Sequence, residues 1–298
     1  MVSLCYFDLL EGEYDEMRAR MKLEDKVAIV TAAGRGIGRG IALSLAKEGA
    51  NVVVNSYHEK TTASTVGEIK KMGRRSLGIG GDITKPDKIV QVIEDTIKAF
   101  GRVDILINNI GGMSMIPKEP ESGPLGQIVA VWDTTYEQNL RATVLMCEAI
   151  APHFTKQRSG KIINISSVAG RPGFPAMDAY GSMKACLIRY TQSLADRLGP
   201  SNINVNCVCP GIIYTDLWKS MAVKTVGNRP EFKGMDPREW FLGIFEGKHP
   251  LRGGSPLTPL RREQTVEDIG RAVVFLVSDD AVNITGQSLN VDGGMIKS

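Results

Sequence analysis

The amino-acid sequence predicts an α/β protein built on one doubly wound parallel sheet with helices on both sides. Apolar, β-branched runs alternate with helix-like segments along most of the chain. These runs are continuously apolar rather than alternating, which is typical of strands that are buried on both faces. Helices between such strands imply parallel pairing, and repeated βαβ units build a doubly wound sheet.

The first half of the chain contains four expected strands, each followed by glycine or polar turn residues. Helices are expected between them, because Pro86 suits a helix start and Gly49, Gly73 and Gly101 suit helix ends. The expected strands are Lys26–Thr31, Asn51–Asn55, Ser76–Asp82 and Val103–Asn108.

The second half continues the alternation with longer helices. One helix is predicted from about Thr134 to Lys156 and another from about Ala179 to Leu198. The apolar runs Lys161–Ser166 and Ile203–Pro210 are the strands expected after them.

The composition is that of an ordinary globular protein. The 298 residues are 43% hydrophobic and 23% charged, and the net charge is +3. No basic run suggests nucleic-acid binding, and no apolar stretch reaches the roughly 18 residues of a membrane-spanning helix. We therefore expect neither nucleic acid nor a membrane as a partner.

The cysteines and histidines suggest neither disulfides nor a metal site. Five cysteines form an odd, scattered set, and three histidines lack the spacing of metal ligands. Buried reduced thiols are the simpler interpretation, and they predict a cytoplasmic protein. The cysteines are Cys5, Cys147, Cys186, Cys207 and Cys209.

No linker or compositional break divides the chain, so one domain is predicted over residues 22–298. The preceding residues 1–21 match no motif and are expected to be an N-terminal extension. Two segments exceed the usual connection length, Asn109–Gly126 and Thr215–Thr265. Long segments in a compact domain are usually functional or disordered.

A glycine-rich turn follows the first expected strand. The strict G-x-G-x-x-G pattern fails because Arg39 holds its last position, and no P-loop lysine is present. Glycines between a strand and a helix nevertheless let the backbone approach a pyrophosphate, which the helix N-terminus stabilises. An ordinary tight turn is the alternative. The turn comprises Thr31, Ala32, Ala33, Gly34, Arg35, Gly36, Ile37 and Gly38.

Tyr180 and Lys184 form a Y-x-x-x-K pair within a predicted helix. Residues four apart share a helix face, so the ammonium is expected near the phenol, where it lowers the pKa of Tyr180. Such a tyrosine can exchange a proton with a carbonyl or an alcohol. The pair alone arises by chance in many helices, but Ser167, at the end of the run Lys161–Ser167, lies thirteen residues earlier. Strand alternation points Ser166 the other way.

Together these motifs resemble the short-chain dehydrogenase/reductase family over about Lys22 to Gly294. The family's T-G-x-x-x-G-x-G turn is matched except at Ala32, and Asn108–Gly111 resembles its N-N-A-G. The segment from Pro210 to Thr215 matches its P-G-x-x-x-T pattern, and Val291–Gly294 resembles its closing strand and turn. The resemblance implies a single-domain Rossmann-type fold with an enlarged substrate lid at about 215–265, most similar to 3-oxoacyl-carrier-protein reductases.

The resemblance also implies the catalytic roles. Tyr180 would be the general acid/base, and Ser167 would orient the substrate oxygen. Lys184 would lower the pKa of Tyr180 and hold the nicotinamide ribose. Asn139 would fix a water molecule that links Lys184 to solvent. The expected reaction is hydride transfer between the nicotinamide and a ketone or secondary alcohol.

The cofactor is expected to be NADP(H). Ser56 stands where an acidic residue would bind both ribose hydroxyls and repel a 2′-phosphate, and Arg35 lies in the turn beside it. NAD(H) remains an alternative because Glu59 could reach a ribose. The expected cofactor-binding residues are Thr31, Gly34, Arg35, Gly36, Ile37, Gly38, Ser56, Asp82, Ile83, Asn109, Gly111, Tyr180, Lys184, Pro210, Gly211, Ile213 and Thr215.

Three further expectations concern the surroundings of the site. Segment 109–126 is interpreted as a pocket rim lined by Met113, Met115 and Ile116, with a plain surface loop as the alternative. Trp240, Phe241 and Phe245 are expected to pack onto the core. The resemblance implies a homotetramer or homodimer, and a catalytically idle NADP-binding sensor or scaffold remains the alternative function.

Overall fold

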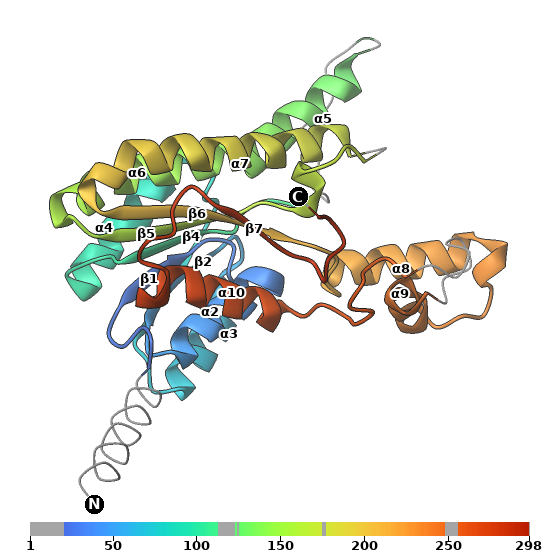
Figure 1. The fold of residues 1–298 in the computed structure, drawn as a ribbon, viewed down its shortest axis with the longest axis horizontal. Helices are drawn as coiled ribbons and strands as arrows, with labels where there is room; N and C mark the ends of the chain where they lie inside the picture. Colours follow the sequence, from blue (N-terminus) through green and yellow to red (C-terminus); the bar gives the residue numbers. More distant parts are fainter. Residues whose placement is uncertain (1–20, 113–122, 124, 175–176, 248–255, 298) are drawn as a thin grey trace, which may run out of the picture.

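The computed structural model describes residues 21–112, 123, 125–174, 177–247 and 256–297. Its centre is a seven-stranded parallel sheet in the order β3-β2-β1-β4-β5-β6-β7 (Figure 1). The strand order reverses between β1 and β4, which is the topological switch point of a doubly wound fold. The predicted single-domain, Rossmann-type architecture is therefore confirmed.

The strands lie close to their predicted positions, because continuous apolar runs leave little freedom in where a buried strand can form. They are β1 Val27–Val30, β2 Asn51–Ser56, β3 Ser76–Gly80, β4 Ile105–Asn108, β5 Gly160–Ile165, β6 Ile203–Pro210 and β7 Ser288–Val291.

Helices cover both faces of the sheet (Figure 1). On one face α2 (Gly36–Lys47), α3 (Glu59–Lys71) and α10 (Val266–Val277) bury Ile41, Ile69 and Val273 with strand residues. On the other face α4 (Pro86–Phe100), α6 (Ala142–Gln157) and α7 (Asp178–Leu198) build a second core around Ile93, Phe154 and Leu194. The sheet is thus buried on both sides, as its apolar strands require.

The helix expected from about Thr134 begins earlier than predicted. Helical structure starts with α5 (Gly126–Tyr136), passes through a π-helical turn (Glu137–Arg141) and continues as α6. The early part escapes pattern recognition because α5 exposes Ile128, Trp132 and other apolar side chains, so a core-facing stripe does not mark its start.

The segment expected to be a lid contains α8 (Asp216–Asn228) and α9 (Pro237–Glu246), which project together from the sheet (Figure 1). Trp240, Phe241 and Phe245 do not pack onto the main core, contrary to expectation. They form a separate cluster with Phe232 and Ala222. A segment distant from the sheet must bury its aromatic side chains against itself, so it has its own small core.

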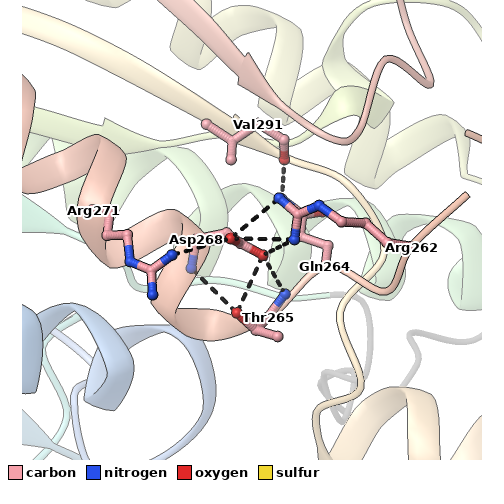
Figure 2. Close-up of polar contacts among 6 residues, drawn as sticks. All are labelled: Arg262, Gln264, Thr265, Asp268, Arg271 and Val291. Carbon is pink, nitrogen blue, oxygen red and sulfur yellow. Dashed lines mark hydrogen bonds and ion pairs between the residues drawn. The ribbon is translucent and has the colours of Figure 1, made fainter. Parts of the chain in front are cut away.

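Helix α10 follows the lid and begins with a capping box, in which Thr265 and Asp268 bind each other's backbone N–H groups (Figure 2). Among the described residues, no helix is long and apolar enough to cross a membrane. Cys147, Cys207 and Cys209 are buried free thiols as expected, whereas Cys186 is exposed on α7.

Candidate active site

The predicted functional residues gather where β1, β4, β5 and β6 end and their following segments begin. In a parallel sheet the carboxyl ends of the strands share one edge, and ligands bind in the crevice outside it. The glycine turn follows β1, Asn109 and Gly111 follow β4, Ser167 follows β5, and Pro210 ends β6. The fold therefore brings together motifs that are far apart in sequence.

Tyr180 and Lys184 lie one turn apart on α7. The Lys184 Nζ atom is 5.6 Å from the centre of the Tyr180 ring and donates a hydrogen bond to the carbonyl oxygen of Ile165 at 3.0 Å. The lysine is only 3% exposed. The hydrogen bond to Ile165, at the end of β5, thus holds the buried Lys184 ammonium near the Tyr180 ring.

The pKa directions differ from the sequence-based expectation. Burial raises the pKa of Tyr180 above its ordinary value, although a hydrogen bond with Ser167 acts in the opposite direction. Burial also lowers the pKa of Lys184 to about 8. Spacing in a helix predicts proximity but not desolvation, and desolvation disfavours both charged forms here.

The two serines after β5 have different partners. Ser167 lies beside the Tyr180 phenol, whose pKa it lowers, and accepts a hydrogen bond from the backbone N–H of Ala169 at 3.1 Å. The buried Ser166 instead donates to the carbonyl oxygen of Lys184 at 2.8 Å. Ser167 is thus the serine beside the phenol, and Ser166 ties β5 to α7.

Asn139 is fully buried within the π-helical turn. Its side-chain oxygen accepts from the N–H of Gly112 at 2.9 Å, and its amide donates to Thr135 at 3.2 Å. A Cβ atom on Gly111 would lie 2.4 Å from the Asn139 oxygen and 3.0 Å from Lys184 Nζ. Asn139 and Lys184 therefore both lie against Gly111, where there is no room for a side chain. π-Helical turns such as the one that contains Asn139 frequently occur at functional sites.

The glycine turn leaves the N-terminus of α2 free of side-chain caps. Arg35 at the N-cap makes no side-chain capping hydrogen bond, and the first turn of α2 carries no acidic residue. Gly36 has a φ of 55°, and a Cβ atom on Gly38 would lie 2.4 Å from the Asn109 amide nitrogen. Free N–H groups at the end of a 12-residue helix suit the pyrophosphate of a dinucleotide.

Ala32 and Thr31 complete this turn. Ala32 has a φ of 51°, a conformation that glycine adopts without the strain that a Cβ atom adds. Asn109 donates to the carbonyl oxygens of Thr31 and Ala32 at 3.2 and 3.3 Å, and Thr31 accepts from the N–H groups of Asn109 and Ile110. The bonds from the β4 segment thus hold Ala32 in place despite the departure from the family's glycine.

The end of β2 lies against the turn. A Cβ atom on Gly34 would lie 2.5 Å from the Ser56 hydroxyl and 2.6 Å from that of Thr61. Arg35 extends from the same turn, and its guanidinium lies 3.5 Å from the Asp216 carboxylate, with both side chains well exposed. Hydroxyl groups and an exposed arginine in this part of the turn are compatible with a 2′-phosphate.

Two other predicted cofactor residues follow β3. The Asp82 carboxylate accepts hydrogen bonds from the N–H and the hydroxyl of Thr84, at 2.9 and 2.8 Å. Ile83 is buried among the residues of the second core. These contacts fix the loop that would face the adenine.

The segment from Pro210 to Thr215 is held on several sides. Pro210 pairs with Val291 at the end of the sheet, and Ile213 forms a parallel bridge with Gln264. Thr215 is the N-cap residue of α8, and its methyl group would lie 3.6 Å from a Cβ atom on Gly36. The lid therefore begins directly across from the glycine turn.

Sequence patterns missed several residues of this region. Thr61, Asp216 and Gln264 carry no motif, because each acts through a contact that only the folded chain creates. Met113, Met115 and Ile116, expected on a pocket rim, lie outside the described residues.

Comparisons with known proteins agree with this geometry. A family model described as short chain dehydrogenase matches residues 26–225, and one described as Enoyl-(Acyl carrier protein) reductase matches residues 248–296. The chain is 35% identical over 276 residues to a 3-oxoacyl-[acyl-carrier-protein] reductase of Staphylococcus epidermidis, which covers 91% of this chain and 99% of that protein.

Solved structures give the same result. L-sorbose reductase from Gluconobacter frateurii, complexed with NADPH and L-sorbose, has a TM-score of 0.80 at 28% identity and covers 94% of this chain and 99% of its own. A 7α-hydroxysteroid dehydrogenase complexed with NADH and 7-oxo glycochenodeoxycholic acid has a TM-score of 0.75 at 33% identity, with 94% and 97% covered.

Proposed function

Since the chain belongs to the short-chain dehydrogenase/reductase family, we propose that it transfers hydride between NADP(H) and a ketone or secondary alcohol, with Tyr180 as the general acid/base. The chain is an oxidoreductase that acts on CH–OH or ketone groups with NAD(P). The proposal adds the cofactor preference, the residue that moves the proton and the roles of its neighbours.

The observation that carries the proposal is the convergence of Ser167, Tyr180 and Lys184 at one point of the sheet edge. Ser167 lies beside the Tyr180 phenol and lowers its pKa, and the Lys184 ammonium lies 5.6 Å from the centre of the Tyr180 ring. A phenol in this position can protonate a carbonyl oxygen that Ser167 also holds. When bound, the nicotinamide supplies the hydride for the neighbouring carbon.

The buried groups next to Tyr180 explain how the proton would be replaced. Lys184 is buried with a pKa of about 8, so it can exchange a proton near neutral pH. Asn139 lies against the same glycine as the Lys184 ammonium. We assign Asn139 the positioning of a water molecule that connects Lys184 to solvent, since a buried ammonium needs a polar route outward.

NADP(H) is the proposed cofactor because β2 ends in Ser56, a hydroxyl residue, rather than in the acidic residue that would repel a 2′-phosphate. The Ser56 hydroxyl lies 3.4 Å from the Thr61 hydroxyl, and Arg35 belongs to the adjoining glycine turn. The relatives bind either cofactor: one solved complex contains NADPH and another contains NADH. The preference therefore depends on this chain's own residues.

The substrate class is proposed as a small ketone or secondary alcohol, of the kinds that the relatives' names include. A β-ketoacyl thioester, a ketose and a keto-steroid are the three types to compare. We also propose a cytoplasmic homotetramer or homodimer. Residues 1–21 are proposed to be an extension outside the catalytic domain.

The test measures turnover of these three ketone types with NADPH and with NADH. The loss of reduced-nicotinamide absorbance reports each reaction. Wild-type protein should reduce at least one ketone, faster with NADPH. Tyr180→Phe removes the hydroxyl and keeps the ring, so turnover should fall about 100-fold or more while the NADPH Kd changes less than about twofold.

Two results would contradict the proposal. Near-normal turnover in Tyr180→Phe would remove Tyr180 from its role. NADPH binding without turnover of any ketone, or of the corresponding alcohols with NADP⁺, would favour the sensor or scaffold function instead.

A further inference from the structure

Tyr214 lies inside the segment that is proposed to hold the nicotinamide, between Ile213 and Thr215. Two side chains contact its ring. The Arg238 guanidinium is 4.3 Å from the ring centre, and the centre of the Phe241 ring is 4.7 Å from it. Both partners belong to α9 of the lid. Helix α9 therefore contacts the proposed cofactor segment through the side chain of Tyr214.

Arg238 is itself held in a fixed orientation. Its Nη1 atom donates to the Glu263 carboxylate at 2.7 Å, and its Nη2 atom donates to the second oxygen of the same carboxylate. The Glu263 side chain is mostly buried. A two-point contact to a carboxylate orients the guanidinium plane, so that its face can stack on the Tyr214 ring.

Glu263 leads directly back to the cofactor segment. The next residue, Gln264, forms the parallel bridge with Ile213, and its side-chain amide donates to the carbonyl oxygen of Val291 (Figure 2). Gly211 donates to the same carbonyl oxygen at 3.0 Å. The contacts form a closed circuit from Ile213 and Tyr214 through Arg238, Glu263 and Gln264 back to Ile213.

We propose that Arg238 is a positioning residue that holds the Ile213–Thr215 segment in its cofactor-binding conformation through Tyr214 and Glu263. The inference rests on the proposed function, because it assigns a task to a residue beside the proposed nicotinamide site. Arg238 does not touch the reacting atoms; it acts by limiting the movement of Tyr214.

The circuit requires arginine rather than a generic cation. A lysine ammonium can pair with Glu263, but it cannot present a planar face to Tyr214 while it binds both carboxylate oxygens. Arg238→Lys should therefore recover the charge but only part of the function. Arg238→Met keeps a similar length and removes both contacts.

The experiment measures NADPH Kd, the KM values of NADPH and ketone, and kcat. Arg238→Met should raise the Kd and KM of NADPH about tenfold, with kcat and the ketone KM within about twofold, and Arg238→Lys should lie between. The matched control is Arg262→Met, because Arg262 is the neighbour of Glu263 yet pairs with Asp268 at 3.2 Å (Figure 2). It should match wild type in all four values.

Arg238→Met also leaves the Glu263 carboxylate unpaired, and that charge alone could repel cofactor phosphates. Glu263→Gln and the double variant Arg238→Met/Glu263→Gln separate the two causes. A weakened NADPH affinity that persists in the double variant supports the positioning role. Full recovery in the double variant would overturn it, as would an increase confined to the ketone KM.

A second experiment combines Tyr214→Leu with Arg238→Met and compares the double variant with the two single variants. If Arg238 acts through the ring, Arg238→Met should add little to Tyr214→Leu, whereas independent effects would multiply. Multiplied effects would overturn the proposal. Wild-type protein that neither binds NADPH nor reduces a ketone would refute the proposed function itself, whereas an active wild type with an unaltered Arg238→Met refutes only the circuit.

Discussion

At the scale of single residues, the site depends on charged groups that are taken out of water. Lys184 is 3% exposed, and its ammonium donates a hydrogen bond to the Ile165 carbonyl oxygen. Desolvation lowers the pKa of Lys184 to about 8 and raises the pKa of Tyr180. Both groups are thus moved toward the neutral form: Tyr180 holds its proton more tightly than a phenol in water, and Lys184 releases its proton more readily than an ammonium in water.

The lowered pKa of Lys184 predicts a pH dependence of stability. Between the folded pKa of about 8 and the ordinary 10.5, the unfolded chain binds more protons, so stability rises with pH. The burial penalty is full below about pH 8 and fades toward pH 10.5. Relative to Lys184→Met, wild type should gain up to about 3 kcal/mol of unfolding free energy over this range.

Urea unfolding of both proteins at a series of pH values measures this difference directly. Other titrating groups are common to both and cancel in the comparison. A difference that stays constant from about pH 7 to 10.5 would show that the ammonium is not desolvated as the fold implies.

At the scale of elements, the cofactor site is made by a turn and the end of the neighbouring strand. Gly34 has no room for a Cβ atom because the hydroxyl groups of Ser56 and Thr61 stand against it. β2 and α3 therefore contribute to the same surface as the glycine turn. The Arg35 side chain points to the lid instead, where it pairs with Asp216. To bind a 2′-phosphate, Arg35 would have to leave Asp216 and turn toward the end of β2.

The β2 end predicts how cofactor preference can be changed. Ser56→Asp places a carboxylate where it repels a 2′-phosphate and accepts from ribose hydroxyl groups. The ratio of kcat/KM for NADPH to that for NADH should fall at least about tenfold, which corresponds to about 1.4 kcal/mol. Kinetics with both cofactors and one ketone measure the ratio.

Ser56→Asn is the matched control, since it adds the same bulk without the charge. It should preserve the preference for NADPH, even if crowding against Gly34 weakens both cofactors. An equal loss of preference in the two variants would mean that size rather than charge acts at position 56, and no change in either would place the 2′-phosphate elsewhere.

At the scale of the whole molecule, the proposed catalytic domain begins at about residue 22. Leu23 is 1% exposed, and its N–H donates to the Glu48 carbonyl oxygen at 2.8 Å. Every strand of the sheet and every proposed catalytic residue follows this point. The short chain dehydrogenase model also begins its match at residue 26.

Deleting residues 1–20 should therefore leave kcat and the cofactor KM within about twofold, less than about 0.5 kcal/mol of barrier. Steady-state kinetics and thermal unfolding of the shortened and full chains test this. A large loss of activity at unchanged Tm would show that the extension reaches an active site.

The sequence by itself determined the alternation of strands and helices, the parallel sheet and the order of the motifs. Those features are local: a buried strand needs a continuous apolar run, and a helix places Tyr180 and Lys184 on one face wherever it lies. Seven predicted or family-implied strands were found close to their expected places for this reason.

Only the tertiary structure decided what surrounds these groups. The π-turn at Asn139, the positive φ of Ala32 and the pKa directions of Tyr180 and Lys184 depend on contacts between segments distant in sequence. The same is true of the separate lid core and of the circuit through Arg238 and Glu263. Packing and desolvation depend on contacts across the folded chain, so residue spacing along one segment cannot predict them.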